Sequence, residues 1–287
     1  MVNIKVIEGG VVNTSNSKRG IYSVAKQYVF KAFGKLFFNK DNNSRIDKST
    51  IYEYIVDLLY PRRCPVCDEV LPVGDSLCDK CKDQFIVVND SFCKKCGKIV
   101  KDNEEYCYDC SNKHFSYKEG RGVFLYNSHM KESISRFKYY GRCEYADYYV
   151  DKIVDTLGYL IRQWGIDTII PVPIHKNKLK FRGFNQAEII ATRLGKRLGI
   201  NVLAEALVRI EDTKPQKGLD NISRRKNLIN AISINNDINI PNCVNNILLI
   251  DDIYTTGATI NACSKRLKSQ NHNYNIYFVS VAIGNGF

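Results

Sequence analysis

The chain has 287 residues, of which 25% are charged and 44% hydrophobic, the balance of an ordinary globular protein. No run approaches the roughly 18–20 apolar residues of a membrane-spanning helix, and the first 20 residues lack the apolar core and cleavage site of a secretory signal. We therefore expect a cytoplasmic protein. Thiols stay reduced in that compartment, so the eleven cysteines are expected to bind metal or pack rather than form disulfides.

The net charge of +12 is unevenly distributed along the chain. Residues 1–60 carry an excess of four positive charges and residues 117–287 an excess of nine, whereas residues 61–116 are slightly negative. A polyanion is the natural partner of such an excess. Solubility alone is the alternative explanation.

The first segment, residues 1–48, is predicted to be an extension that contains one basic amphipathic helix. Apolar residues recur at helical spacing between 18 and 40, six basic residues accompany them, and no acid occurs between Glu8 and Asp41. Such a helix suits an anionic membrane surface, at the inner face of the membrane, or a groove on a partner. Packing on the protein's own domain is the alternative.

The second segment, residues 49–116, is predicted to be a short helix followed by a metal-binding module. Thr50 and Glu53 form a capping box before the helix. Eight cysteines then form four C-x2-C pairs, and each position of the first C-x2-C-x10-C-x2-C unit recurs 29 residues later: Cys64, Cys67, Cys78, Cys81, Cys93, Cys96, Cys107 and Cys110. Two such pairs can surround one tetrahedral Zn²⁺.

Four pairs predict two closed structural zinc sites. Pairing within each copy is the simplest arrangement, and a cross-braced arrangement of the first pair with the third is the alternative. Because the segment is already negative and thiolates would add to that charge, we expect a scaffold or protein-docking unit rather than a nucleic-acid finger. Cys143, Cys243 and Cys263 stand alone and are expected to be buried.

The third segment, residues 117–287, alternates between strand and helix patterns. Strands are predicted at 120–127, 166–174, 245–253 and 274–283, and helices at 128–140, 146–164, 184–199 and 256–270, whereas 202–210 is ambiguous. Nearly uninterrupted apolar strands in such alternation predict a parallel sheet covered on both faces. The fold class is therefore α/β, preceded by a small zinc module.

Residues 245–259, NNILLIDDIYTTGAT, combine an apolar strand, two acids, a Thr-Thr-Gly loop and a helix start. The strand delivers the loop to the carboxyl edge of the sheet, where α/β folds bind ligands. Gly257 lets the backbone approach an anion. The loop groups predicted to ring a phosphate at the helix N-terminus belong to Thr255, Thr256, Gly257, Ala258 and Thr259.

The two acids of this segment, Asp251 and Asp252, cannot favour a phosphate, and they fit ribose hydroxyls or Mg²⁺ better. The whole segment resembles the phosphoribosyl-pyrophosphate signature of type I phosphoribosyltransferases. That resemblance predicts a catalytic role for both carboxylates. A coincidental strand–turn–helix is the alternative.

Two further segments are basic. Residues 171–191 read as a strand end, a basic loop and a helix, and the loop contains Lys176, Lys178, Lys180 and Arg182. Residues 214–232 contain Gln216, Leu219, Arg224 and Asn227. From 176 to 226 there are 13 basic and 5 acidic residues, the densest positive stretch of the chain. A solvated basic loop is the alternative to an anion site.

The repeated cysteine pairs, the sequence R-G-F-N-Q at 182–186 and IDDIYTTGAT at 250–259 together resemble the ComF family of bacterial competence proteins. The resemblance covers about 51–287, and it extends to the Q-x2-L-x4-R-x2-N pattern of 216–227. That pattern usually ends in Ala-Phe, whereas this chain has Ala231-Ile232. The resemblance implies a type I phosphoribosyltransferase fold, with pyrophosphate facing Lys176, Lys178, Lys180, Arg182 and Arg224.

The resemblance also implies a role in natural transformation, in which the protein handles single-stranded DNA beside a competence helicase. Two functions follow. The domain binds phosphoribosyl pyrophosphate with Mg²⁺ and also binds single-stranded DNA, or it is an active phosphoribosyltransferase for an unidentified base or amine. Phe137, Tyr139 and Tyr140 are the candidates to stack an acceptor base. A zinc-bearing adaptor to a helicase is a third option.

Overall fold

The computed structural model describes residues 61–286 apart from 73, 90, 102–103 and 211–230. All described residues belong to the unit that spans residues 46–287. The predicted helices of 18–40 and 50–60 and the pattern of 214–230 lie outside the described residues. Within the described part, no helix is both long and apolar enough to cross a membrane.

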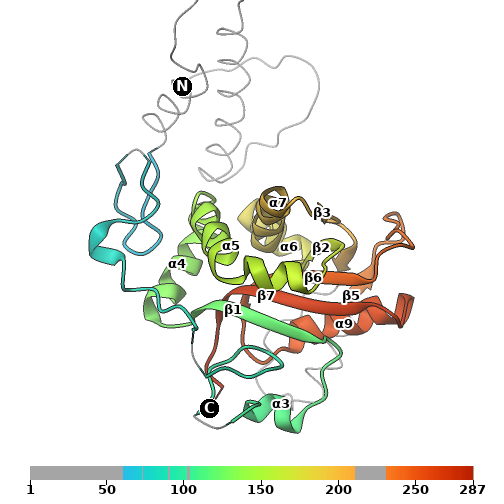
Figure 1. Ribbon diagram of the computed structural model, residues 1–287. Helices are drawn as coiled ribbons and strands as arrows, with labels where there is room; N and C mark the ends of the chain where they lie inside the picture. Colours follow the sequence, from blue (N-terminus) through green and yellow to red (C-terminus); the bar gives the residue numbers. More distant parts are fainter. Residues whose placement is uncertain (1–60, 73, 90, 102–103, 211–230, 287) are drawn as a thin grey trace, which may run out of the picture. The chain divides into compact units, whose positions relative to one another are not determined.

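A parallel sheet of five strands forms the centre of this unit (Figure 1). In the order in which they lie, the strands are β1 (Glu119–Leu125), β7 (Asn275–Ile283), β6 (Asn246–Tyr254), β2 (Thr168–Pro171) and β3 (Asn201–Val202). The middle strand is buried from Ile247 to Ile250, as expected of a parallel sheet covered on both faces. The predicted fold class is therefore confirmed.

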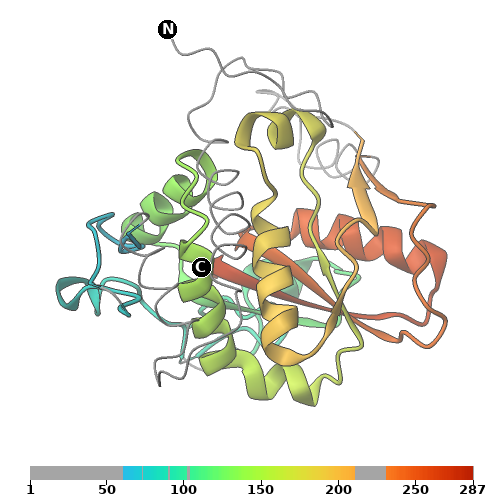
Figure 2. The same cartoon turned by 90° about the horizontal axis from the view of Figure 1, so that it is seen from above.

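Helices cover both faces of this sheet. On one face lie α4 (Ser128–Tyr139), α5 (Tyr145–Gln163) and α7 (Gln186–Leu198), and on the other lies α9 (Ala258–Gln270). Figure 2 shows α5 and α7 running over the strands. Asn185 caps the start of α7 by accepting a hydrogen bond from the Ala187 N–H, and Gly199 ends that helix in the left-handed conformation, as predicted.

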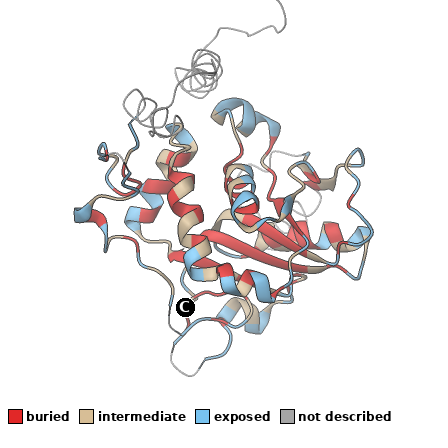
Figure 3. Cartoon of the chain, turned by 45° about the horizontal axis from the view of Figure 1, so that its top comes forward, coloured by how far each residue is buried: buried red, intermediate tan, exposed pale blue. Residues whose placement is uncertain are grey.

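The sheet separates two hydrophobic cores because successive strand residues point to opposite faces. Leu248 and Ile250 of β6 belong to the core under α5 and α7, whereas Ile247 and Leu249 belong to the core over α9. Figure 3 shows the strands as the continuous buried layer between them. Each cysteine copy joins a different core: Cys64 and Cys81 belong to the first, and Cys93, Cys96 and Cys107 to the second.

The segment between the two cysteine copies runs antiparallel along β1, the outer strand of the sheet. The Val88 N–H donates to the Val123 carbonyl at 2.9 Å, and the Leu125 N–H donates to the Ile86 carbonyl at 2.8 Å. Phe85 anchors this strap, residues 85–88, because its ring packs 5.3 Å from Phe124. The repeat therefore straddles the edge of the sheet, with one copy on each side of it.

Several local predictions were incomplete. The basic loop after β2 is a helix, α6 (Lys176–Arg182), because His175 accepts a hydrogen bond at its start and Gly183 ends it in the left-handed conformation. The ambiguous 202–210 segment contributes β3 and then β4 (Leu207–Arg209), which pairs antiparallel with β5 (Ile232–Ile234). Short helical turns at η1 (Asp79–Cys81) and α3 (Tyr108–Asn112) were not predicted.

The lone cysteines were only partly predicted. Cys263 is buried as expected, Cys143 is half-buried, and Cys243 is exposed. Cys243 lies in the loop before β6, where little of the chain packs around it. Residue type alone therefore did not predict that its side chain is exposed.

Replacing Phe85 with Ala should reduce the free energy of unfolding by about 3–5 kcal/mol, the usual cost of removing a buried aromatic ring. The neighbouring Ile86, which is exposed, is the matched control, and Ile86→Ala should change the free energy by about 0.5 kcal/mol or less. Urea unfolding monitored by circular dichroism measures both. Equal losses in the two variants would contradict the anchoring role of the Phe85 ring.

Candidate phosphate site and zinc centres

The eight paired cysteines form two compact clusters, one from each copy of the repeat. Within each cluster all four sulfur atoms lie within 4.8 Å of one another. The Sγ atoms of Cys67 and Cys78 are 3.7 Å apart, and those of Cys96 and Cys107 are 3.6 Å apart. A tetrahedron with Zn–S bonds of about 2.3 Å has an edge of about 3.8 Å, so both clusters fit Zn²⁺. Pairing is within each copy, and the cross-braced alternative is wrong.

The residue after the second cysteine adopts a positive φ in both copies, but its identity differs. In the second copy it is Gly97, with φ of 79°, and in the first it is Asp68, with φ of 64°. Glycine enters this conformation without strain, whereas an L-residue does so at a cost. Asp68 is therefore expected to provide a contact that glycine cannot.

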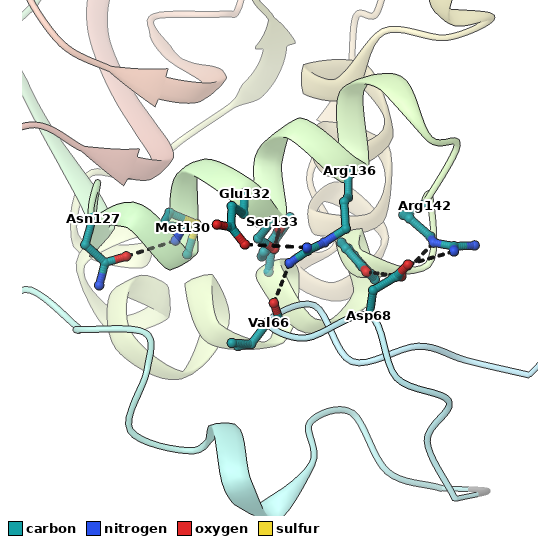
Figure 4. Close-up of polar contacts among 10 residues, drawn as sticks. Val66, Asp68, Asn127, Met130, Glu132, Ser133, Arg136 and Arg142 are labelled. Atoms are coloured by element: carbon teal, nitrogen blue, oxygen red, sulfur yellow. Dashed lines mark hydrogen bonds and ion pairs between the residues drawn. The ribbon is translucent and has the colours of Figure 1, made fainter.

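The Asp68 carboxylate joins the first cysteine cluster to the turn between α4 and α5 (Figure 4). It accepts two hydrogen bonds from the Arg142 guanidinium, at 2.7 and 2.8 Å, and one from the Tyr145 hydroxyl at 2.6 Å. Desolvation opposes ionisation, but these hydrogen bonds lower the pKa of Asp68 below its usual value. On α4, Arg136 also donates to the Val66 carbonyl. The metal module thus holds the C-terminal half of α4 in place.

The Thr-Thr-Gly loop lies between β6 and α9, as predicted. Gly257 is the N-cap of α9 with φ of 74°, and it offers no side chain to the first N–H groups of the helix. A Cβ at this position would lie 2.5 Å from the Tyr254 hydroxyl. Glycine is therefore required both by conformation and by space. The helix N-terminus, with Thr255 and Thr256 exposed beside it, has the donors and the dipole that favour an anion.

The segment between the second cysteine copy and β1 supports this loop. The Tyr117 and Tyr254 hydroxyls share a hydrogen bond of 2.6 Å in the buried core. The Asn261 side chain in α9 accepts from the Ser116 N–H at 2.7 Å. Together these contacts fix the end of β6 and the first turn of α9, so the loop between them is held at both ends.

The two acids occupy β6 just before the loop, and they differ in environment. Asp252 forms an ion pair with Lys138 of α4, with Nζ and Oδ2 2.6 Å apart, and both side chains are largely buried. Desolvation and the neighbouring Asp252 carboxylate raise the pKa of Asp251 to about 8. Burial therefore favours the protonated form of Asp251, while Lys138 neutralises Asp252.

Four of the five basic residues predicted to face pyrophosphate lie on α6. Lys176 and Lys180 are exposed, whereas Lys178 and Arg182 are half-buried. Because β2 and β6 are adjacent and parallel, α6 and the Thr-Thr-Gly loop follow their strands at the same edge of the sheet. Arg224 lies outside the described residues.

The R-G-F-N-Q sequence has a mainly structural explanation. Arg182 donates from Nη1 to the Gln186 side chain at 2.9 Å, and the Phe184 ring packs 6.0 Å from that of Phe137. Asn185 bridges back to the Val172 carbonyl at 3.1 Å while it caps α7. The motif thus fixes the turn from α6 into α7 at the strand edge.

Sequence reasoning predicted the helix that contains the last turn of α4 but missed the role of that turn, which links the acids to α6. Lys138 contacts Asp252, and the next residue, Tyr139, accepts a hydrogen bond from Arg182 Nη2 at 3.1 Å. Of the three aromatic residues proposed to stack a base, Phe137 is fully buried and unsuited to that role, whereas Tyr139 and Tyr140 are exposed. The run F-K-Y-Y at 137–140 includes Lys138. Only the three aromatic residues of this run were recognised as candidate site residues.

Comparison with known proteins decides the family. Residues 55–111 match the family described as "Double zinc ribbon domain". The chain is 32% identical to "Competence protein ComFC" of Streptococcus pneumoniae over 56% of this chain and 68% of that protein.

The chain belongs to the ComF family.

Other relatives of this ComF-family chain agree. "Competence protein F" of Haemophilus influenzae is 29% identical over 72% of this chain and 90% of that protein. "DNA utilization protein YhgH" of Escherichia coli strain K12 is 25% identical over 69% of this chain and 80% of that protein. With the ribbon match and the sulfur geometry, the two cysteine clusters of this ComF-family chain are structural zinc sites.

Solved phosphoribosyltransferases also align with this ComF-family chain. Xanthine-guanine-hypoxanthine phosphoribosyltransferase of Helicobacter pylori aligns at 13% identity and a TM-score of 0.29, over 51% of this chain and 83% of that one. Adenine phosphoribosyltransferase of Saccharomyces cerevisiae aligns at 15% identity and a TM-score of 0.32, over 58% and 81%. Scores this low carry no argument, and the fold of the ComF-family chain is taken from its own sheet and helices.

The ComF-family chain should bind two Zn²⁺ per molecule and release them at different rates on addition of a chelator. Cys67 of the first cluster is exposed, whereas three cysteines of the second are buried, so the first ion should leave faster. Cys67→Ser should remove only the fast phase, and Cys243→Ser, at an exposed unpaired cysteine, should change neither phase. Metal analysis and a colorimetric zinc indicator give the measurement, and one ion per chain would refute the two-site arrangement.

Proposed function

We propose that this chain is a competence protein that acts in DNA uptake and that its α/β domain binds phosphoribosyl pyrophosphate and single-stranded DNA. The names of its relatives, "Competence protein F" and "DNA utilization protein YhgH", support the general role. A competence helicase is the proposed protein partner, as family membership implies. The geometry and the charge of the described residues support both ligands.

The loop from Thr255 to Thr259 is the observation that carries phosphoribosyl pyrophosphate binding. It combines an uncapped helix N-terminus, a required glycine and two acids at the preceding strand end. In the proposed complex the 5-phosphate lies on this loop, and the acids face the ribose hydroxyls. The pyrophosphate lies towards α6, whose Lys176, Lys178, Lys180 and Arg182 supply the opposite charge.

Mg²⁺ is the proposed partner of the pyrophosphate, and the acids are its nearest candidate ligands. Asp252 is neutralised by Lys138, and the raised pKa of Asp251 favours its protonated form. A Mg²⁺–pyrophosphate group would replace that internal cation and proton with an external cation. Lys138 would then be free to contact a ligand oxygen, so α4 is part of the proposed site.

The distribution of charge supports DNA binding by the α/β domain. Residues 117–287 hold nine of the twelve excess positive charges, whereas the zinc ribbons are negative. On α6, Lys176 and Lys180 are exposed at the proposed anion-binding edge. Exposed lysines that follow a backbone give affinity without sequence preference.

Catalytic turnover is the second candidate function, and the raised pKa of Asp251 favours it, because such shifts gather at reactive sites. In this case an acceptor base or amine would displace pyrophosphate from the anomeric carbon. Release of pyrophosphate from phosphoribosyl pyrophosphate with Mg²⁺ and a panel of bases separates turnover from binding alone.

Asp252→Asn and Thr256→Val should each weaken phosphoribosyl pyrophosphate binding by about 1.5–3 kcal/mol, the value of a hydrogen bond or ion contact to a charged group. Isothermal titration calorimetry with Mg²⁺ measures the change. Asp155→Asn, at an exposed carboxylate of α5, is the matched control and should bind as the unaltered protein does. Unchanged affinity in both site variants would show that the loop is not the phosphate site.

The pH dependence of the same titration tests Asp251. Its pKa is raised to about 8, so the proton must leave before the carboxylate can hold a cation. Affinity in the presence of Mg²⁺ should therefore rise between pH 7 and 8 and level off above. Asp251→Asn should abolish this rise while leaving the contribution of the other groups unchanged.

Single-stranded DNA should bind with an affinity that falls steeply with salt, at a slope of about −0.7 per phosphate neutralised. Because Lys176 and Lys180 are both exposed, replacing both with Glu should flatten the slope by about 1.4 if each neutralises one phosphate. Fluorescence anisotropy of a labelled oligothymidylate measures this.

The control makes the same change in charge elsewhere. Lys131→Glu with Lys265→Glu alters two exposed lysines, on α4 and α9, and should leave the slope near its original value. If the two double variants lose affinity equally, the effect reflects net charge and not an α6 contact. Failure of the full chain to bind at low salt would remove DNA from the proposal.

A further inference from the structure

Exposed aromatic and aliphatic side chains gather where α4 ends beside α6. Among the described residues, eleven large hydrophobic side chains are exposed, and four of them lie here: Tyr139, Tyr140, Leu179 and Phe181. Phe181 is 64% exposed although it belongs to a helix whose other residues are mainly basic. Large apolar groups exposed together, beside charge of one sign, mark an interaction surface.

Two of these residues, Tyr139 and Phe181, form an ordered cluster with Arg182, which we call the α4–α6 aromatic cluster. The Tyr139 and Phe181 rings are 6.4 Å apart and inclined at 60°. The Arg182 guanidinium lies 4.9 Å from the centre of the Tyr139 ring and also donates to its hydroxyl. Because Arg182 is held by both Tyr139 and Gln186, the Tyr139 ring is fixed before any ligand arrives.

A planar aromatic ligand matches this arrangement. Two exposed rings and a guanidinium plane are the groups on which nucleobases stack. Beside them, Gln186 is 98% buried, and its Nε2 finds no acceptor among the described residues, so a hydrogen-bond donor is also unsatisfied there. Lys176, Lys178 and Lys180 lie on the same helix as Phe181 and supply positive charge for phosphates.

We propose that the α4–α6 aromatic cluster stacks a nucleobase of single-stranded DNA while the lysines of α6 contact the adjacent phosphates. The inference rests on the proposed DNA binding and adds the part of the strand that is recognised. It also predicts a preference for single strands, because the faces of paired bases are covered by their neighbours in a duplex. The cluster adjoins Lys138 and hence Asp252, so DNA and the phosphoribosyl site would lie side by side.

A tryptophan placed in the cluster reports stacking directly. In Phe181→Trp, the emission of the new indole should be quenched by oligothymidylate and not by an abasic oligonucleotide of equal length. The native Trp164 is buried and gives the background measured in the unaltered protein. Tyr159→Trp, at an exposed position on α5, is the matched control and should show no quenching.

Affinity tests the same proposal without a reporter. Oligothymidylate should bind the unaltered protein roughly tenfold or more tightly than the abasic strand, since stacking of one base is worth about that factor. Tyr139→Leu with Phe181→Leu should remove this difference while leaving abasic binding unchanged. The circular dichroism spectrum should be preserved because both side chains are exposed.

The outcomes separate this inference from the proposed function. If the thymidylate and abasic strands bind equally, DNA binding stands and base stacking is wrong. If neither binds, the DNA part of the proposed function fails and the inference falls with it. Free adenine or guanine, at the same concentration of bases, could quench the emission as strongly as the oligonucleotide does. That result would assign the cluster to a free base and would contradict the proposal that it binds a DNA strand.

Discussion

The candidate site depends on one constraint, that parallel strands present their carboxyl ends at a single edge of a sheet. Strand β6 lies in the middle of the five and is buried along its apolar half. Its next residues, Asp251 and Asp252, lie towards that edge. Strands β1 and β2 end at the same edge and lead into α4 and α6, so residues far apart in sequence converge around the two acids.

Helix α4 connects the residues that converge at this edge. Its last turn carries Lys138, which neutralises Asp252, and Tyr139, which holds Arg182 of α6. The other side of the same helix is tied to the first zinc ribbon through Arg136 and the following Arg142. The two copies of the repeat have thus diverged in role. Asp68 fixes α4 where the second copy has Gly97, whereas the second copy places Lys98 over the ring of Tyr254, the residue before the Thr-Thr-Gly loop.

The sequence predicted those features that leave a local or periodic pattern. Apolar runs predicted the strands, and the 29-residue repeat predicted both cysteine clusters. Helix α6 was missed because it is short, basic and without an apolar face, and because its cap is a buried histidine. The Lys138–Asp252 pair was missed because its members are distant in sequence and meet only through the fold. The repeat places Asp68 and Gly97 at equivalent positions, so this difference between the two copies was already visible in the sequence.

The strap between the ribbons has a consequence for a cell that is short of zinc. Strand β1 is the edge of the sheet, and Val123 and Leu125 on its outer side form backbone hydrogen bonds with Val88 and Ile86. That strap is held at each end by a metal cluster, so loss of the metal would loosen its anchors. A bare edge strand is a template on which another chain can add. Zinc binding would then prevent self-association of this protein as well as stabilise its fold.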